Sequence, residues 1–243
     1  MAAQAAPPDT GLLNNKTSRN EQDTLTTDQD TPIALEARAE KEARLYSPSV
    51  ERNREVIKDV FLKTMPTAGQ VLEIASGTGE HGVHIARHAP ALTWLPGDPD
   101  ARSRASIAAW REASGLKNIM PPHDIDARQM PWAFETASLD GIVAINMIHI
   151  APFDAARGVF HEAGRILKPG GKLFLYGPFS RKGVHAAPSN ADFDRSLKAQ
   201  DAQWGVRDLD EELIPTAASA GLQIEATISM PANNLSVVFI KRG

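Results

Sequence analysis

The stretch Val71-Leu-Glu-Ile-Ala-Ser-Gly-Thr-Gly-Glu-His-Gly82 decides the fold that we expect for this chain. It begins as an apolar run, passes through a glycine-rich turn and continues into a helical pattern. This order is typical of a buried strand, a tight loop and a helix whose first N–H groups have no partner within the helix. Gly77 and Gly79 allow the backbone to approach a ligand closely. The stretch therefore predicts a binding loop at the end of a strand.

Strand-like and helix-like segments alternate beyond this loop. We expect strands at Val71–Ala75, Leu92–Gly97, Ile119–Pro121, Gly141–Asn146, Lys172–Gly177, Leu222–Ser229 and Ser236–Lys241. We expect helices at Glu80–His88, Ala101–Ala113, Asp154–Leu167, Asp192–Ala199 and Leu209–Ala220. Such alternation predicts an α/β fold with a mostly parallel, doubly wound sheet. Only Met230–Leu235 separates the last two strands, which is too short for a helical crossover, so those strands should be antiparallel.

The chain before the loop divides into three parts. Residues 1–32 are rich in polar residues and poor in large apolar ones, so we expect a disordered tail there and a single domain over 33–243. Residues 33–45 have a charged, helix-like pattern. Ser47 and Pro48 then predict the start of a further helix, with Ser47 as the N-cap and Pro48 at the first helical position.

Composition and charge narrow the function classes. Residues 1–40 contain seven acidic and three basic residues, which accounts for the whole chain's net charge of −4 and leaves residues 41–243 neutral. A neutral domain lacks the basic surface that nucleic-acid binding requires, and no apolar run approaches the roughly 20 residues of a membrane span. The absence of cysteine and of a signal-peptide pattern favours a cytoplasmic location. We therefore expect a small-molecule partner, with neither nucleic acid nor membrane.

Two cofactor classes fit the glycine loop. Gly77, Gly79 and Gly82 match the G-x-G-x-x-G fingerprint of NAD-binding folds, and Asp98 follows Gly77 by 21 residues. Glu73 favours the other class, because a carboxylate inside the strand can meet the cationic methionine end of S-adenosylmethionine (SAM) but offers nothing to a pyrophosphate. The antiparallel final hairpin also differs from the parallel second half of a dinucleotide fold. SAM is the cofactor that we expect, and an NAD-dependent oxidoreductase is the less favoured alternative.

The spacing Glu73-x-x-x-Gly77-x-Gly79 resembles motif I of class I SAM-dependent methyltransferases. The resemblance implies a doubly wound, mostly parallel sheet of seven strands in the order 3-2-1-4-5-7-6, with an antiparallel last strand. It also implies that Asp98 accepts both ribose hydroxyls of SAM and that an acid after the third strand accepts from the adenine amino group. Asp124 and Asp126 both fit that second role, and the sequence leaves the choice open. The expected cofactor-binding residues are Glu73, Ala75, Gly77, Gly79, Asp98, Asp124, Asp126 and Asn146.

Several segments together resemble a narrower family. They are Leu45–Asn53, Leu72–Gly79, Ile145–Ile150, Tyr176–Phe179, Pro188–Asn190, Trp204–Asp208 and Met230–Leu235. This set is similar to the methyltransferase-like twenty-six group, a set of class I methyltransferase-like proteins whose function is largely unassigned. The resemblance covers about residues 40–243 and implies a SAM-binding fold without a named acceptor.

The acceptor side is predicted from polar residues at strand exits and in loops that could converge on one cavity. The expected set is Tyr46, Asn53, His149, Tyr176, Asn190, Asn233 and Asn234. It is rich in hydrogen-bonding groups and poor in charge, which suits a small polar or soft nucleophile. His149 could act as a general base near neutral pH, or it could simply cap the end of a strand. We expect His149, Tyr46 and Asn146 near the transferable methyl group.

Three further histidines, His81, His84 and His88, recur at helical spacing. The residues between His84 and His88 lack the glutamate of the H-E-x-x-H zinc motif, so we predict a solvated helix face and no metal site. Trp110, Trp132 and Trp204 are expected to be packing residues.

The predicted function is a SAM-dependent methyltransferase acting on an unidentified small molecule. The alternative from another class is a SAM-binding sensor or interaction module without catalysis. Fold alone does not decide between them, because chemistry belongs to the site.

Overall fold

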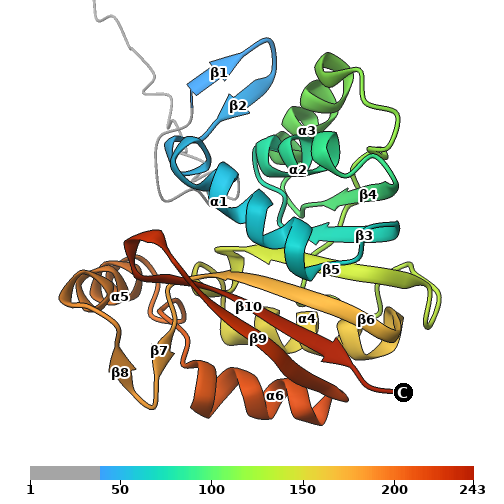
Figure 1. Ribbon diagram of the computed structural model, residues 1–243. Helices are drawn as coiled ribbons and strands as arrows, with labels where there is room; N and C mark the ends of the chain where they lie inside the picture. Colours follow the sequence, from blue (N-terminus) through green and yellow to red (C-terminus); the bar gives the residue numbers. More distant parts are fainter. Residues whose placement is uncertain (1–38) are drawn as a thin grey trace, which may run out of the picture. The chain divides into compact units, whose positions relative to one another are not determined.

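The computed structural model describes residues 39–243, so the expected tail at residues 1–32 lies outside the described part of the chain. Figure 1 shows how the elements of this part are arranged. The strands are β1 (Ala39–Lys41), β2 (Arg44–Tyr46), β3 (Gly69–Ile74), β4 (Leu92–Gly97), β5 (Leu139–Ile145), β6 (Leu167–Gly177), β7 (Ser180–Arg181), β8 (Val184–His185), β9 (Leu222–Met230) and β10 (Asn234–Lys241). The helices are α1 (Pro48–Thr64), α2 (Glu80–His88), α3 (Ala101–Ser114), α4 (Phe153–Ile166), α5 (Pro188–Gln200) and α6 (Ile214–Ser219), with short helical turns η1 (Met147–His149), η2 (Leu209–Leu213) and η3 (Pro231–Asn233).

The main sheet of the described residues has six strands in the order β4-β3-β5-β6-β10-β9. The pairs β3–β4, β3–β5 and β5–β6 are parallel. Strand β10 lies between β6 and β9 and is antiparallel to both. The expected mostly parallel α/β sheet and its antiparallel final hairpin are therefore confirmed.

The expectation of a seventh strand at Ile119–Pro121 is wrong for this structure. The chain there makes only two isolated parallel bridges to the edge strand β4, one from Ile119 and one from His123. Pro121 and Pro122 lie between these bridges, and neither has the backbone N–H that a continuous ladder needs. This run therefore lies beside the sheet edge without extending it as a strand.

Helices cover both faces of the sheet (Figure 1). On the face of α1, α2 and α3, the ring of Phe61 meets Trp94 and Phe174 edge-on, with centroids 5.6 and 6.1 Å apart. On the face of α4 and α6, Phe160 and Phe239 meet at 5.2 Å between ring centroids. Two buried cores hold this sheet rigidly, and its parallel strands all point their carboxyl ends to one edge, where ligands bind in such folds.

The helix expected over residues 33–45 is not present in its described part. Residues 39–46 instead form the hairpin of β1 and β2, in which Glu42 and Ala43 take left-handed φ values of 53° and 65°. Tertiary hydrogen bonds to α3 favour the extended form: the Leu45 N–H donates to Ser106 Oγ at 2.8 Å, and Trp110 Nε1 donates to the Leu45 carbonyl at 2.9 Å. These bonds override a helical pattern that is only a weak local preference. The next helix, α1, does begin at Pro48, as predicted.

Between β6 and η2 lies the segment Ser180–Asp208, which we call the insertion segment. Its two ends are hydrogen-bonded to each other. It contains β7, β8 and α5. The Ser180 N–H donates to the Arg207 carbonyl at 3.1 Å, and Ser180 Oγ donates to Asp208 Oδ2 at 2.9 Å. Asp208 Oδ2 also accepts the Gly183 N–H at 2.7 Å, so one carboxylate ties the hairpin turn to the segment's end.

The helix expected at Leu209–Ala220 is divided into two parts. The first, η2, is a π-helical turn closed by the Leu213 N–H, which donates to the Asp208 carbonyl at 3.1 Å, and α6 follows it. Pro215 stands at the junction, and its missing N–H removes one bond of a regular α-helix.

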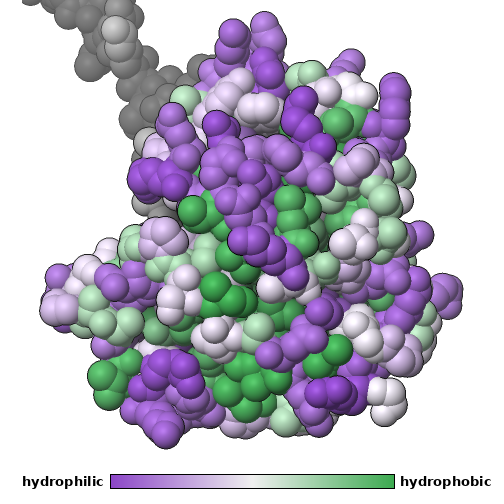
Figure 2. Space-filling model, viewed as in Figure 1, coloured by the Kyte–Doolittle hydropathy of each residue, from purple (hydrophilic) through white to green (hydrophobic). Residues whose placement is uncertain are grey.

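Surface character differs between the two ends of the view in Figure 2. Hydrophilic side chains predominate in the upper part, over the β1–β2 hairpin and α1, whereas hydrophobic side chains gather lower, over β9 and β10. The edge strand β9 contributes Ile224, which is 37% exposed. Among the described residues, none of the helices is both long and apolar enough to cross a bilayer.

Deleting residues 1–30 should leave the melting temperature of the protein unchanged within about 1 °C. The segment has almost no large apolar side chains with which to contribute to a core, so its removal costs no burial. Differential scanning calorimetry of the two proteins is the measurement. A fall of several degrees would show that the segment packs on the domain.

Candidate cofactor and acceptor site

A cavity of about 980 Å³ opens at the carboxyl ends of the parallel strands β3, β4, β5 and β6. Its wall includes the glycine loop, the start of α1, the exits of β5 and β6, and parts of α5 and of the turn before β10. This volume is within the upper range for small-molecule sites, and the position is the one that doubly wound sheets use for ligands. The fold therefore brings most of the predicted residues to one cavity.

The glycine loop enters the cavity through a strained turn. Ala75 takes a left-handed φ of 53°, and Gly77 follows at 58°. The Gly77 N–H donates to Asp98 Oδ2 at 2.8 Å, which ties the loop to the end of β4. Gly79 is not part of the cavity wall: a Cβ there would lie 3.0 Å from Ile107 Cα, so this glycine permits close packing of α3.

Glu73 lies in the cavity wall at the end of β3 and is almost fully buried. Its Oε2 accepts a hydrogen bond from Trp94 Nε1 at 3.0 Å. Burial raises the pKa of the Glu73 carboxyl to about 7, against the opposing effect of the hydrogen bonds from Trp94 and Ser76. A carboxyl in this state is uncompensated when ionised, so a cationic ligand beside it would favour its charged form.

Asp98 and Asp100 have different positions at the end of β4. Asp98 is buried in the cavity wall, where Oδ2 holds Gly77 and Oδ1 accepts the Asp100 N–H at 2.9 Å. Asp100 is the N-cap of α3 and accepts the backbone N–H groups of Arg102 and Ser103. Asp100 thus caps α3, whereas Asp98 holds the glycine loop at the same strand end; both residues line the cavity.

The structure separates the two candidate acids that follow Ile119–Pro121. Asp126 belongs to the wall of the main cavity and is paired with Arg128, whose hydrogen bonds hold the pKa of the Asp126 carboxyl below its usual range. Asp124 has a side chain 70% exposed, forms an ion pair with Arg104 at 3.0 Å, and lines only a smaller neighbouring cavity. Of the two acids, Asp126 is therefore the one that lines the main cavity.

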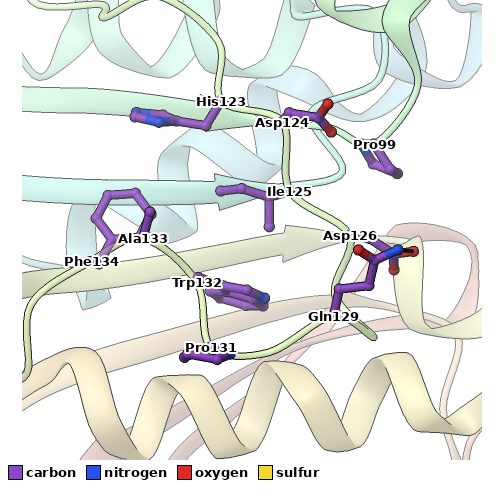
Figure 3. Close-up of a pocket in the computed structure, with 10 residues that line it drawn as sticks. All are labelled: Pro99, His123, Asp124, Ile125, Asp126, Gln129, Pro131, Trp132, Ala133 and Phe134. Atoms are coloured by element: carbon purple, nitrogen blue, oxygen red, sulfur yellow. Dashed lines mark hydrogen bonds between the residues drawn. The ribbon is translucent and has the colours of Figure 1, made fainter.

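The smaller cavity, of about 560 Å³, lies beneath the loop that carries both acids. Figure 3 shows the rings of His123 and Phe134 on one side of it and the indole of Trp132 below, with the indole nitrogen toward Asp126 and Gln129. Glu162 of α4 holds this loop, since its Oε2 accepts a hydrogen bond from the backbone N–H of Trp132 at 3.0 Å. The residues around the smaller cavity therefore help to hold the loop that carries Asp126.

The exit of β5 is a second strained turn in the cavity wall. Asn146 takes a left-handed φ of 60°, and its N–H donates to the Tyr176 carbonyl at 2.8 Å. The turn η1 follows and carries His149, which is 1% exposed and packs edge-on against Phe179 with centroids 5.0 Å apart. Strained backbone that the surrounding structure holds in place is common at functional sites.

A network of neutral polar groups from α1, α2 and the exit of β6 forms another part of the cavity wall. Asn53 Oδ1 accepts from His81 Nε2 at 2.9 Å, and the Tyr176 hydroxyl is hydrogen-bonded to Asn53 and Asn234. Burial lowers the pKa of His81 to about 3, so the ring is a neutral donor at physiological pH. His81 therefore does not belong to a solvated helix face, and that expectation is wrong for this residue.

Two predicted acceptor-side residues, Tyr46 and Asn233, lie outside the cavity wall. Tyr46 packs against Trp110 with ring centroids 5.0 Å apart and is not part of the cavity wall. Asn233 also lies outside the wall, but its carbonyl accepts from Asn190 Nδ2 at 3.1 Å. Asn190 does line the cavity, so the contribution of Asn233 to the cavity is to hold the Asn190 side chain in place.

Sequence patterns missed several residues of the wall. His81 could have been found, because it follows the glycine loop by two residues at the start of α2. Phe193 and Trp204 could not, because they come from the insertion segment, whose path over the sheet edge no local pattern predicts. Trp110 packs against Tyr46, as expected, and Trp204 also contributes to the cavity wall.

Comparison with solved structures places this fold among methyltransferase-like α/β proteins. The chain is similar to an O-methyltransferase family protein from Burkholderia thailandensis, with a TM-score of 0.66 and 19% identity over 80% of this chain and 58% of that one. It is also similar to a putative sarcosine dimethylglycine methyltransferase from Galdieria sulphuraria, with a TM-score of 0.64 and 16% identity over 82% of this chain and 92% of that one. A third, an O-methyltransferase family 2 protein from Planctomyces limnophilus in complex with apigenin, gives a TM-score of 0.64 and 17% identity over 82% and 64%. These identities show a shared fold, and this chain spans little more than half of the first structure.

The family itself is defined by sequence. The chain belongs to the family described as "Protein of unknown function (DUF938)", whose model matches residues 44–241. That range includes every residue of the cavity wall.

Proposed function

We propose that this protein binds SAM in the main cavity and transfers its methyl group to a small molecule. The observation that carries the proposal is that two carboxyls line the cavity on either side of the glycine loop. Glu73 lies near the end of β3, and Asp98 directly follows β4. The resemblance to class I methyltransferases and to the methyltransferase-like twenty-six group supports the same reading. So does the methyltransferase fold of the structural neighbours.

The residues of the wall fit the parts of SAM. Asp98, whose carboxylate oxygens hold the backbone N–H groups of Gly77 and Asp100, would also accept the ribose hydroxyls. Asp126 would accept from the adenine amino group. Glu73 would face the cationic methionine end. SAM would supply a methyl group on a positively charged sulfur, from which a nucleophile can take it in line.

The rest of the wall would position the acceptor. Asn53, Tyr176, Asn190 and Asn234 offer amide and hydroxyl groups that orient a substrate without charging it. Holding two reactants in line can supply a large part of the rate enhancement when the nucleophile is already reactive. Positioning is therefore the main task that we assign to these side chains.

The first experiment separates this proposal from its alternatives. Isothermal titration calorimetry should show binding of SAM and no binding of NAD. Protein incubated with SAM carrying a deuterated methyl group and a small-molecule cell extract should release S-adenosylhomocysteine and yield a labelled product by mass spectrometry. Binding without turnover would support a sensor or interaction module, and tight NAD binding would support the oxidoreductase.

SAM affinity should depend on pH through Glu73. The free protein holds this carboxyl with a pKa of about 7, and a neighbouring cation would require the ionised form. Each pH unit below about 7 should then weaken SAM binding by up to roughly tenfold, about 1.4 kcal/mol. The folding stability of the free protein should change with pH in the opposite direction. The raised pKa of Glu73 in the folded state contributes stability that is fully present below about pH 4.5 and is lost as the pH rises through about 7.

Calorimetry from pH 5.5 to 8.5 measures this dependence. Glu73→Gln, which cannot ionise, should show a nearly flat affinity over the same range. An equally steep pH dependence in Glu73→Gln would assign the titration to another group.

A further inference from the structure

The insertion segment brings one charged side chain to the cavity wall. Its residues in the wall are Ser189, Asn190, Phe193, Asp201 and Trp204. Asp201 and Trp204 are both partly exposed, unlike the buried ring of His149. The turn that carries them is held beside the exit of β5, because the Gly205 N–H donates to the His149 carbonyl at 3.0 Å. Asp201 thus belongs to the part of the wall that we assign to the acceptor.

The Asp201 carboxylate has one hydrogen-bond donor among the described residues. Asp201 follows the last residue of α5, and its Oδ1 accepts the Gln203 N–H at 2.8 Å. No described residue donates to its Oδ2, and no described lysine, arginine or histidine pairs with it. Nothing in the described part of the chain therefore offsets the negative charge of this carboxylate.

The other acids of the insertion segment are satisfied within the protein. Asp192 pairs with Arg195 on the surface of α5. Asp194 pairs with Lys198 at 2.6 Å. Asp208 accepts hydrogen bonds from a hydroxyl and from several backbone N–H groups. None of these three acids lines the cavity, so the acid that does line it is the one with a single donor.

Two aromatic rings accompany this carboxylate in the wall. Trp204 lies on the same turn, where its N–H donates to the Asp201 carbonyl at 3.0 Å, and Phe193 comes from α5. Neither ring packs against another aromatic ring or a guanidinium of the described residues. The face of an aromatic ring attracts a cation, most strongly for Trp, and a carboxylate adds a direct charge partner. This combination suits an ammonium group.

The charge of the whole wall agrees with a cationic ligand. The wall contains five carboxyl groups and two guanidinium groups; the set is Glu73, Asp98, Asp100, Asp126, Asp201, Arg52 and Arg128. Arg128 is paired with Asp126. In the proposed site, SAM would meet the acids at the ends of β3 and β4, which leaves Asp201 for the acceptor. A wall with an excess of negative charge favours a positively charged ligand over an anion.

His149 adds no positive charge to this side of the wall. Burial, followed by the nearby Arg207 charge, lowers the pKa of His149 to about 3, so the ring is neutral near pH 7. The Arg207 N–H donates to its Nδ1 at 3.2 Å, and its buried Nε2 has no partner among the described residues. A ring with this pKa takes up almost no proton near pH 7, so we assign His149 no general-base role.

We propose that the methyl acceptor is a small primary or secondary amine whose ammonium group binds Asp201 beside the Trp204 ring. This inference rests on the proposed function, since it names the substrate class for the same cavity. A carboxylate stabilises the ammonium form, which has no lone pair with which to attack, so the methyl group goes to another atom of the same molecule. The lone pair of that atom forms the new bond to carbon, and the electrons of the C–S bond return to the sulfur of SAM. Any proton displaced from that atom leaves to water.

The first arm of the test compares variants in the extract assay with deuterated SAM. Asp201→Asn keeps an oxygen for the Gln203 N–H but removes the charge, so labelled product formation at limiting acceptor should fall roughly 10- to 100-fold. Asp201→Glu keeps the charge and should lose less. Asp192→Asn is the matched control, because it makes the same change on an acid of α5 outside the cavity wall, and it should behave as wild type.

SAM affinity separates an acceptor role from a cofactor role. Calorimetry should give an affinity within about twofold of wild type for all three variants, with circular dichroism to confirm their fold. Weakened SAM binding by Asp201→Asn would overturn the proposal, because the carboxylate would then serve the amino group of SAM. Full activity of Asp201→Asn at limiting acceptor would overturn it as well.

A second arm uses only the wild-type protein, so it does not depend on the folding of a variant. Amines in the extract are either acetylated, which removes their charge, or reductively dimethylated, which keeps a charged nitrogen with an N–H. Acetylated extract should yield no labelled product, whereas dimethylated extract should still yield it. Loss of product from both extracts would overturn the proposal, since the amine nitrogen itself would then take the methyl group.

The same measurements keep this proposal apart from the proposed function. Undiminished product from acetylated extract would overturn the amine acceptor and leave the proposed function standing. Absence of both SAM binding and labelled product with untreated extract would instead contradict the proposed function, and the amine acceptor would fall with it.

Discussion

Asp98→Ala should weaken SAM binding by about 2–4 kcal/mol, which is roughly a 30- to 1,000-fold rise in the dissociation constant. In the proposed site, the substitution would remove a charge-assisted acceptor for two ribose hydroxyls. It also releases the Gly77 N–H, which Asp98 Oδ2 holds at 2.8 Å, so the glycine loop loses its tie to β4. Calorimetry on the folded variant is the measurement, with circular dichroism to confirm the fold.

Asp124→Ala is the matched control for this prediction. It is the same chemical change nearby, at a side chain that is 70% exposed and paired with Arg104. SAM affinity should stay within about twofold, because surface ion pairs contribute little. Equal losses for both variants would show that the adenosine end of the cavity is assigned to the wrong acids.

Glu162→Ala should lower the free energy of unfolding by about 2–4 kcal/mol. Glu162 is fully buried, accepts the Trp132 N–H at 3.0 Å and is paired with Arg165, which also donates to the carbonyls of Trp132 and Phe134. Removing one partner of such a pair leaves the other charge uncompensated, and partial exposure of Arg165 reduces the effect below that of a fully buried pair. Chemical denaturation monitored by circular dichroism measures the change.

Asp154→Ala tests whether burial is the cause. Asp154 pairs with Arg157 three residues along the same helix, but both side chains are more than half exposed. The expected loss is below about 0.5 kcal/mol. If the two substitutions destabilise equally, the anchoring of the loop by Glu162 contributes nothing beyond a surface pair.

Local patterns predicted the parts of the fold that local energetics decide. Helices α2 and α3 and strand β4 have bounds at or within one residue of those expected, because apolar periodicity and capping residues act over a few positions. The hairpin at residues 39–46 could not be predicted in this way. Its extended form depends on hydrogen bonds to Ser106 and Trp110, about sixty residues away in the chain.

The candidate site divides in the same manner. Glu73, Gly77 and Asp98 could be predicted because Glu73 lies within a strand and the other two follow strands, and strands with their ends can be recognised in the sequence. The state of His149 was not readable, since its neutrality and its unpaired nitrogen depend on burial and on the Arg207 backbone, 58 residues further along. Sequence spacing identifies a titratable residue but gives no information about its dielectric surroundings.

The insertion segment has a consequence for how acceptor preference could change. Its ends are joined by a hydrogen bond from Ser180 to Asp208. Three residues inside it contribute to the cavity wall: Asn190, Phe193 and Trp204. When the ends of a loop are fixed together, doubling its length changes the closure entropy by only about 0.6 kcal/mol. Residues can therefore be added, removed or exchanged within this span at small thermodynamic cost, while the sheet and the glycine loop remain as they are. If the protein acts as proposed, one part of the chain would hold the cofactor unchanged, while the insertion segment could vary with the acceptor.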